Sequence, residues 1–325
     1  MNRSYSLVAF EETRRDEYLG LLRDAWGEGS MTAAAFDWWF GGNLEGSLLS
    51  IAEIDGRAVG VAGHSLARAI VGGRQCLVQF SVHATTAEEA RGLGIFRALE
   101  VRHEEQGTEL DSQAVLAFAS APTHPLFLGP LGWTQIDRRR VWARALRPVL
   151  RRLARKGAPA GGLREVALGE RANTRVHPVE RFSEAADAAY AAAAPSLRNH
   201  LVRDARYLNW RYLDSPKDYR AFSSSYGFSV VGHKLHRGVS TAYVAELVAP
   251  RGEASELLSR CVAEARGGAE IVVAVPSPTL PKALLARAGF VPSTVVLDFM
   301  GKGLAAPIDA RSEAWSVSLG DTDFF

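Results

Sequence analysis

The spacing of apolar residues alternates between strand-like and helix-like segments along the first half of the chain. Apolar residues recur at helical spacing in 13–26, 33–40 and 93–105, whereas 48–54, 58–65 and 75–85 have the composition of strands. Asp55 and Gly56 separate two of these strands and predict a hairpin. Residues 114–119 are apolar throughout, as in a strand buried on both faces. The pattern predicts a mixed α/β sheet with one central crossover.

An internal repeat extends this pattern to the second half. The aromatic-rich stretch 36–40 resembles 208–212, and the tryptophans at the centre of each stretch are 172 residues apart. Each tryptophan is followed 22 residues later by a glycine, Gly60 in the first copy and Gly232 in the second. Further on, 131–133 matches 288–290 at an offset of only 157, so the second copy is about 15 residues shorter in between.

The length of 325 residues also favours two domains of roughly 150 residues each. We expect a first domain at 1–145, a connector at 146–163 and a second, degenerate domain at 164–325. Residues 138–156 contain nine basic and no acidic residues, which suits either a solvated connector or a nucleic-acid site. Apolar residues interleave with the basic ones and the net charge is only +2. We therefore favour the connector and expect no nucleic-acid partner.

Neither a targeting segment nor a metal site is indicated. The first ten residues lack an apolar run, and nowhere do about 18 uncharged apolar residues follow one another. We expect a cytoplasmic protein without a membrane partner. Cys76 and Cys261 lie in apolar stretches far apart in the sequence, which favours free thiols over a disulfide or a metal ligand pair.

A glycine-containing turn follows the longest predicted strand. Arg91, Gly92, Leu93 and Gly94 open the helix predicted at 93–105. Glycines let the backbone approach a ligand closely, and the unpaired N–H groups of a helix's first turn attract phosphate. A tight strand-to-helix turn without a ligand would use the same residues, so both interpretations stay open at this point.

This turn resembles the coenzyme A loop of the GNAT superfamily of N-acyltransferases, whose pattern is Arg or Gln, two residues, Gly, one residue, and Gly or Ala. Phe96 stands where the family has its last small residue. The stretch 131–133, Leu-Gly-Trp, is similar to the family's late Leu-Gly-Phe signature. The resemblance implies two tandem GNAT-like domains and a site for acetyl-CoA or another acyl-CoA in the first. The residues it assigns to that site are Ala84, Thr85, Thr86, Arg91, Gly92, Leu93, Gly94, Ile95 and Phe96.

The resemblance also implies direct attack of an acceptor amine on the thioester. The tyrosine that family members often use as an acid falls on Phe127 or Leu128 here. Three substitutes are candidates: His83, Ser120 and His124. Gln79, Ser81 and His83 alternate along one strand, which predicts a polar face and a cleft. His124 follows the buried strand that ends near Ser120, where a loop can face a substrate. A structural histidine is the alternative for both histidines.

Other polar and aromatic groups have simpler interpretations. The aromatic stretches 36–40 and 207–212 could line an acceptor pocket, but their repetition favours core packing. Glu246 could face a cleft, but an ion-paired carboxylate is favoured. Asp321, Asp323 and the carboxylate of Phe325 could supply a base, although a frayed tail is the ordinary outcome.

Together these patterns predict an acyl-CoA-dependent N-acyltransferase that acts on the amine of a small molecule without a metal. The alternative is a noncatalytic CoA-binding or scaffold protein that retains the GNAT fold. Whether the chain forms a homodimer is left open.

Overall fold

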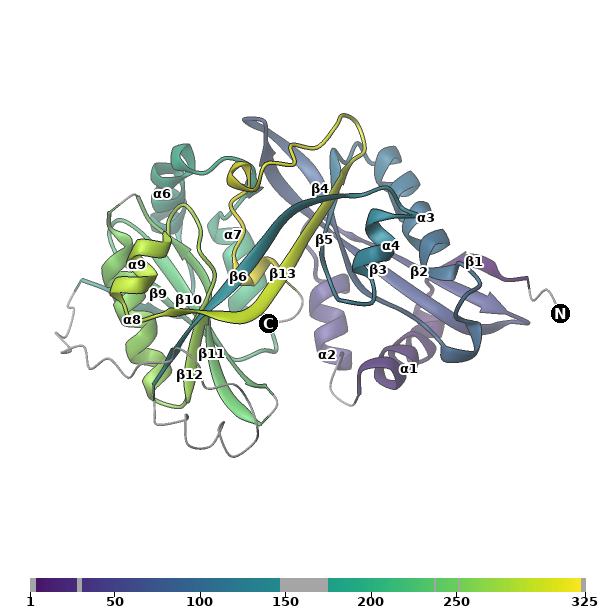
Figure 1. Ribbon diagram of the computed structural model, residues 1–325, viewed down its shortest axis with the longest axis horizontal. Helices are drawn as coiled ribbons and strands as arrows, with labels where there is room; N and C mark the ends of the chain where they lie inside the picture. The colour runs from purple at the N-terminus through teal and green to yellow at the C-terminus, as the bar shows by residue number, and fades with distance from the viewer. Residues whose placement is uncertain (1–3, 28–30, 147–174, 237, 251, 323–325) are drawn as a thin grey trace. The chain divides into compact units, whose positions relative to one another are not determined.

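A computed structural model describes residues 4–27, 31–146, 175–236, 238–250 and 252–322 (Figure 1). The predicted connector from residue 147 onward lies outside the described residues, as do its five basic residues between Arg147 and Lys156. The chain forms two compact units. Unit 1 comprises Met1–Asp137 and Asp298–Ser312, and unit 2 comprises Arg138–Leu297 and Glu313–Phe325.

Unit 1 is built around one mixed sheet. Its strands run in the order β1-β2-β3-β4-β5-β13-β6, and β4 and β5 are parallel. The strands are β1 (Ser6–Ala9), β2 (Ser47–Ile54), β3 (Arg57–Val71), β4 (Arg74–Thr86), β5 (Ala114–Ala119), β6 (Thr134–Ala145) and β13 (Val291–Gly303). The helices and turns are η1 (Glu12–Arg14), α1 (Arg15–Trp26), α2 (Ala33–Phe36), η2 (Asp37–Gly41), η3 (Glu88–Ala90), α3 (Ile95–Glu109) and α4 (His124–Leu128).

Helix α3 packs closely on β2 and β3. Ile95 and Leu99 join a buried cluster with Ala52 and Ala62. Gly60 permits this approach, because a Cβ atom there would lie 2.6 Å from Cγ2 of Ile95. The helix that follows the glycine turn is therefore held in place by the sheet.

Unit 2 repeats this plan. Its sheet order is β6-β12-β11-β10-β9-β7, and β11 and β12 form its parallel pair. The strands are β7 (His177–Val179), β8 (His200–Leu201), β9 (Tyr219–Ser223), β10 (Phe228–His236), β11 (Val239–Val248) and β12 (Ile271–Ala274). The helices and turns are α6 (Glu184–Ala193), η4 (Ala194–Ser196), α7 (Ala205–Leu208), η5 (Asn209–Leu213), α8 (Ala254–Arg266), α9 (Lys282–Arg287), η6 (Ser312–Ala314) and η7 (Leu319–Asp321).

The internal repeat is confirmed residue by residue at the helix that precedes the first long hairpin. Thr32 caps α2 by accepting a hydrogen bond from the backbone of Ala35, and Asp204 caps α7 in the same way from Tyr207. Each short helix then widens into a π-helical turn, η2 or η5, at the same offset of 172 residues. The two copies thus share backbone conformation as well as aromatic residues.

Each unit is assembled from two separate stretches of chain. The boundary falls within β6, after Asp137, and again within β13, after Leu297. In unit 1 the second half of β13 pairs with β5, from Asp298↔Ala119 to Gly303↔Ala114. In unit 2 the second half of β6 pairs with β12. The sequence pattern did not indicate this return of the chain, and the division at residues 145 and 164 stays a prediction.

Candidate functional site

Strands β4 and β5 separate partway along their length. Their parallel pairing runs from Val78↔Ala114 to Phe80↔Leu116, whereas β4 continues to Thr86 and β5 to Ala119. Beyond Phe80, β4 remains paired with β3 on its other side. The edge of β4 that faces β5 is thus left without a β5 partner, so the two strands enclose a gap at their carboxyl ends.

A β-bulge distorts β4 at this gap. Val61 pairs with Thr85 and Gly63 with Val82, so that His83 and Ala84 together face a single residue of β3. His83 adopts a φ of 52°, which is uncommon for a residue with a side chain. Bulges of this kind occur next to active sites, where they redirect backbone groups.

The bulge also overturns the prediction of a shared polar face. The His83 ring packs edge-on against Trp39 and Phe40, at centroid distances of 5.8 and 6.2 Å. Gln79 and Ser81 instead point toward α3, where Ser81 donates to Glu100. The bulge breaks the strict alternation that the prediction assumed, and His83 is separated from the other two.

The polar face of β4 is not a cleft but a buried hydrogen-bond network, which corrects a second expectation. His64 Nδ1 lies 2.8 Å from Gln79 Oε1 and its Nε2 lies 3.1 Å from Glu100 Oε2. The His103 ring packs edge-on against His64 at a centroid distance of 4.5 Å, and burial, followed by the neighbouring His64 and Arg102, holds the pKa of His103 well below its ordinary value. Helix α3 covers the whole network.

The glycine turn has the geometry of an anion site. Gly92 and Gly94 have φ values of 81° and 80°, and no atom lies within 4 Å of where a Cβ would stand at either. Gly94 is the N-cap of α3, and its carbonyl accepts from Ala98. In the part of the chain that the structure describes, no backbone N–H from Gly92 to Phe96 has an acceptor. These donors lie at the positive end of a 15-residue helix without an acidic residue in its first turn.

Phe96 does not obstruct this turn. Its ring packs edge-on against Phe127 at 5.6 Å, and Phe127 in turn contacts Trp133. The side chain that replaces the family's small residue therefore joins the core beneath α3 and α4. The backbone donors of the turn remain available.

Ser120 and His124 lie at the carboxyl end of β5, the same end of the sheet as the glycine turn. The Ser120 hydroxyl is hydrogen-bonded to Thr123 in the turn that starts α4. His124 Nε2 lies 3.3 Å from Gln135 Oε1, and Gln135 donates through Nε2 to Asp298 at 3.1 Å. Gln135 and Asp298 were not predicted, since they are 163 residues apart and meet only because β13 returns to unit 1.

The structure settles three simpler interpretations. Glu246 is 3% exposed and paired with Arg203 at 2.6 Å, so the ion-paired interpretation is confirmed. The aromatic residues of η2 and η5 are buried in both units, as core packing predicts. Both cysteines are free thiols, Cys261 buried and Cys76 half-buried.

Within the described ranges, no helix is long and apolar enough to cross a membrane, and no cluster of three potential metal ligands occurs.

Comparison with solved structures gives the fold a name. Neither a known protein family nor a curated protein matches the sequence. The chain shares the fold of GCN5-related (GNAT) N-acetyltransferases, as the glycine turn predicted.

Three solved structures illustrate the likeness. A GCN5-related N-acetyltransferase from Kribbella flavida is similar over 95% of this chain and 74% of its own, with a TM-score of 0.63 and 22% identity. Eis1 from Mycobacterium abscessus is similar over 93% and 74%, with a TM-score of 0.58 and 14% identity. Saccharomyces cerevisiae N-myristoyltransferase with bound myristoyl-CoA is similar over 92% and 82%, with a TM-score of 0.62 and 11% identity.

Proposed function

We propose that the chain is an acyl-CoA-dependent N-acyltransferase, with acetyl-CoA as the default donor and the amine of a small molecule as the acceptor. The observation that carries the proposal is the set of backbone donors from Gly92 to Phe96, which have no acceptor among the described residues and lie at the same end of the sheet as the β4–β5 gap. The solved structures with this fold include an N-acetyltransferase and an N-myristoyltransferase with bound myristoyl-CoA, which supports the same kind of reaction.

The residues fit an acyl-CoA. The pyrophosphate would accept hydrogen bonds from the amides of 92–96, aided by the dipole of α3. The pantetheine arm would lie in the gap and pair with the free edge of β4 at Ala84, Thr85 and Thr86, as an added strand does. Arg91 is exposed beside the turn and adds a positive charge near the phosphates.

The chemistry requires a neutral amine and a proton donor for the departing thiolate. A carbon–nitrogen bond forms as the carbon–sulfur bond breaks, and one proton moves from the amine to the thiolate. We assign this transfer to His124. With its Nε2–H donated to Gln135, Nδ1 carries a lone pair that can accept the proton and later return it. The Ser120 hydroxyl is already bound to Thr123 and the His83 ring is held by aromatic contacts, so both rank below His124.

Isothermal titration with acetyl-CoA tests the cofactor site. The wild type should bind, and Gly94→Glu should not, because the carboxylate would project from the turn beside the pyrophosphate. Gly73→Glu is the matched control, since the φ of Gly73 is 79°, close to that of Gly94, and its surroundings are equally open. Gly73 lies in the hairpin before β4, at the opposite end of that strand from the glycine turn. Equal affinity of both variants would reject the assignment of the turn, and absence of wild-type binding at millimolar ligand would reject the proposal.

A noncatalytic CoA-binding or scaffold role is the second candidate. The observation in its favour is that Phe127 is buried against Trp133 and Leu128 is an exposed leucine, so neither replaces the family's acid. An assay of thiol release over a panel of amines separates the two candidates. Binding of acetyl-CoA without release on any amine would favour the scaffold, whereas amine-dependent release would eliminate it.

A further inference from the structure

Unit 2 contains a gap that corresponds to the one between β4 and β5. The parallel pairing of β11 and β12 runs only from Thr241↔Ile271 to Tyr243↔Val273, although β11 continues to Val248. Beyond Tyr243, β11 is paired with β10 on its other side only. The parallel pair of unit 2 therefore separates in the same way as that of unit 1.

The chain's own residues 315–322, here called the tail segment, occupy this second gap. The tail segment is buried from Trp315 to Thr322 except at the half-buried Ser318, so the expectation of a frayed end is wrong for these residues. Ser318 donates to Glu246 of β11 at 3.1 Å. Gly320 approaches the strand so closely that a Cβ atom there would lie 2.9 Å from the carbonyl oxygen of Ala245 and would collide with the Tyr212 hydroxyl.

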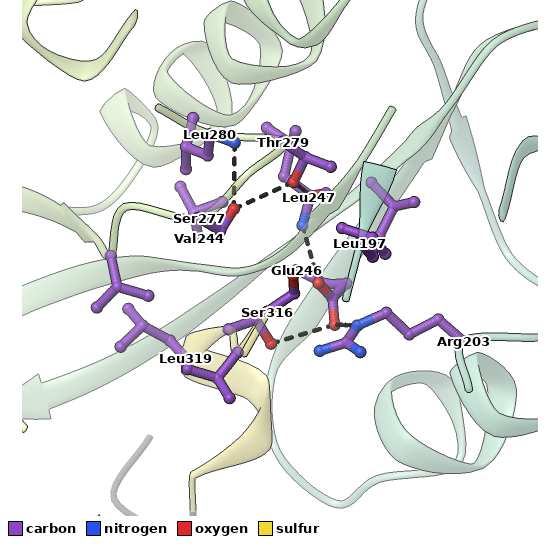
Figure 2. Close-up of a pocket in the computed structure, with 14 residues that line it drawn as sticks. Leu197, Arg203, Val244, Glu246, Leu247, Ser277, Thr279, Leu280, Ser316 and Leu319 are labelled. Carbon is purple, nitrogen blue, oxygen red and sulfur yellow. Dashed lines mark hydrogen bonds and ion pairs between the residues drawn. The ribbon is translucent and has the colours of Figure 1, made fainter. Parts of the chain in front are cut away.

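What remains of the gap is a cavity of about 20 Å³ between the tail segment, β11 and the loop after β12 (Figure 2). A cavity of this size holds about one water molecule. On the far side of the cavity, Thr279 donates to the carbonyl oxygen of Leu247 at 2.8 Å, which satisfies a backbone group on the unpaired edge of β11. No room is left for a ligand arm.

Two buried arginines fix the tail segment to unit 2. Arg203 donates to both carboxylate oxygens of Asp321, at 2.7 and 3.0 Å, and also to Glu246 at 2.6 Å. Arg211 donates to the carbonyl oxygens of Gly320 and Thr322. Burial lowers the pKa of Arg203, but the carboxylates of Asp321 and Glu246 outweigh burial and raise it well above the ordinary value. Arg203 is thus paired with two carboxylates, and the tail segment supplies one of them.

The absence of a glycine turn agrees with this occupation. After β11 the chain reaches α8 within a few residues, and Gly252, with a φ of 102°, precedes the N-cap Glu253 rather than forming the cap itself. Glu253 would place a carboxylate where unit 1 has Gly94, a position unfavourable for a pyrophosphate.

We propose that the tail segment is a built-in occupant of the unit 2 gap, so that one chain binds a single acyl-CoA, in unit 1. The inference about stoichiometry rests on the proposed function, whereas the occupation of the gap does not. Asp321 is then an anchor of the tail segment and not a base for the reaction.

Hydrogen exchange measured by mass spectrometry on the full chain tests the occupation. In the wild type, the amides of 316–322 should exchange as slowly as those of β11, at least about 100-fold more slowly than a free peptide. Exchange at the rate of a free peptide would overturn the proposal, with or without acyl-CoA binding.

Gly320→Ala should raise the exchange rate of 316–322 at least tenfold, because the added methyl group displaces the tail segment from Ala245. Gly268→Ala is the matched control in the same unit, since nothing lies within 4 Å of a Cβ there and no positive φ is required. Equal protection in both variants would contradict the proposed contact. Should Gly320→Ala fail to fold, the exchange rates of 316–322 in the wild type still test whether the tail segment occupies the gap.

Titration of the wild type with acetyl-CoA should give one site per chain. Two sites per chain would overturn the single-site inference while supporting the proposed function. Absence of binding would reject the proposed function, and the exchange rates of 316–322 would still judge the occupation of the gap independently.

Discussion

The Nε2 atom of His64 lies 3.1 Å from Oε2 of Glu100, and neither side chain has any exposed surface. The contact joins β3 to α3, the helix whose first turn we propose holds the pyrophosphate. Gln79 and Ser81 extend the contact to β4, the strand that borders the gap. The pair therefore links the two elements that the proposed cofactor site requires.

Breaking this pair should destabilise unit 1 strongly. Removal of one partner leaves a buried polar or charged group unpaired, so His64→Leu and Glu100→Leu should each lower the free energy of unfolding by about 3–5 kcal/mol. The double variant should cost at least about 1 kcal/mol less than the sum of the two, because both unpaired groups are removed together. Urea denaturation of the four proteins measures the cycle.

Glu105→Leu provides the control on the same helix, since Glu105 is exposed. Its effect on the free energy of unfolding should stay within about 0.5 kcal/mol. Strict additivity of His64→Leu and Glu100→Leu would show that the two side chains do not stabilise the fold as a pair.

Acid should destabilise unit 2 through His200. Burial lowers the pKa of His200 to about 4, while Nδ1 donates to the Arg198 carbonyl and Nε2 faces the Tyr190 hydroxyl. Between pH 6.5 and 4 the unfolded chain binds a proton here that the folded chain does not. Stability is therefore complete above pH 6.5 and is lost as the pH falls toward 4.

His200→Gln should reduce the loss of free energy of unfolding between pH 7 and pH 5 by at most about 2 kcal/mol. This is the largest contribution of one proton over the 1.5 pH units between 6.5 and 5. Urea midpoints at the two pH values measure it. Tyr190→Phe should lower stability at both pH values and leave the pH dependence in place. An unchanged slope in His200→Gln would show that this histidine does not titrate between folded and unfolded states.

The two cysteines should differ in reactivity. Burial raises the pKa of the Cys261 thiol to about 12, so almost no thiolate forms there at pH 8. Cys76 is half-buried and should react slowly with a thiol reagent such as 5,5′-dithiobis(2-nitrobenzoate). The native chain should then release at most one equivalent of dye, and the unfolded chain two. If the native Cys76→Ala variant still reacted with the reagent, this prediction would be contradicted. The same variant lowers the background of protein thiols in the thiol-release assay.

His124→Ala should lower kcat by about 10²–10⁴-fold with a smaller change in KM for the donor, because the histidine acts on the proton and not on the cofactor. Gln135→Leu should lower kcat in the same direction but by less, since the bond that orients the ring is lost while the ring itself remains. His177→Ala, at an exposed histidine of unit 2, should leave kcat and KM unchanged.

Features that depend on neighbouring residues could be predicted from the sequence. The aromatic stretch before each hairpin marks a helical segment and a shared core in both units, because a repeated core needs the same large side chains at the same offset. The π-helical turn that ends each segment was not predicted. The glycine turn is also local, since Gly92 and Gly94 adopt left-handed backbone conformations that residues with a side chain disfavour.

Features that depend on strand register or on contacts between distant segments could not be predicted from the sequence. One extra residue in β4 moves the His83 ring away from Gln79 and Ser81, and no local pattern marks a bulge at a histidine. The contact between Gln135 and Asp298 requires β13 to return to unit 1. The bond between Arg203 and Asp321 joins residues 118 positions apart, and the sequence alone makes Asp321 look like part of a loose end.

The crossing of β6 and β13 from one unit to the other means that a cut in the connector would not yield two working modules. A fragment ending at residue 145 would lack the half-strand that completes its sheet beside β5, and would expose that strand's edge to self-association. Engineering of this scaffold has to treat both copies as one inseparable object.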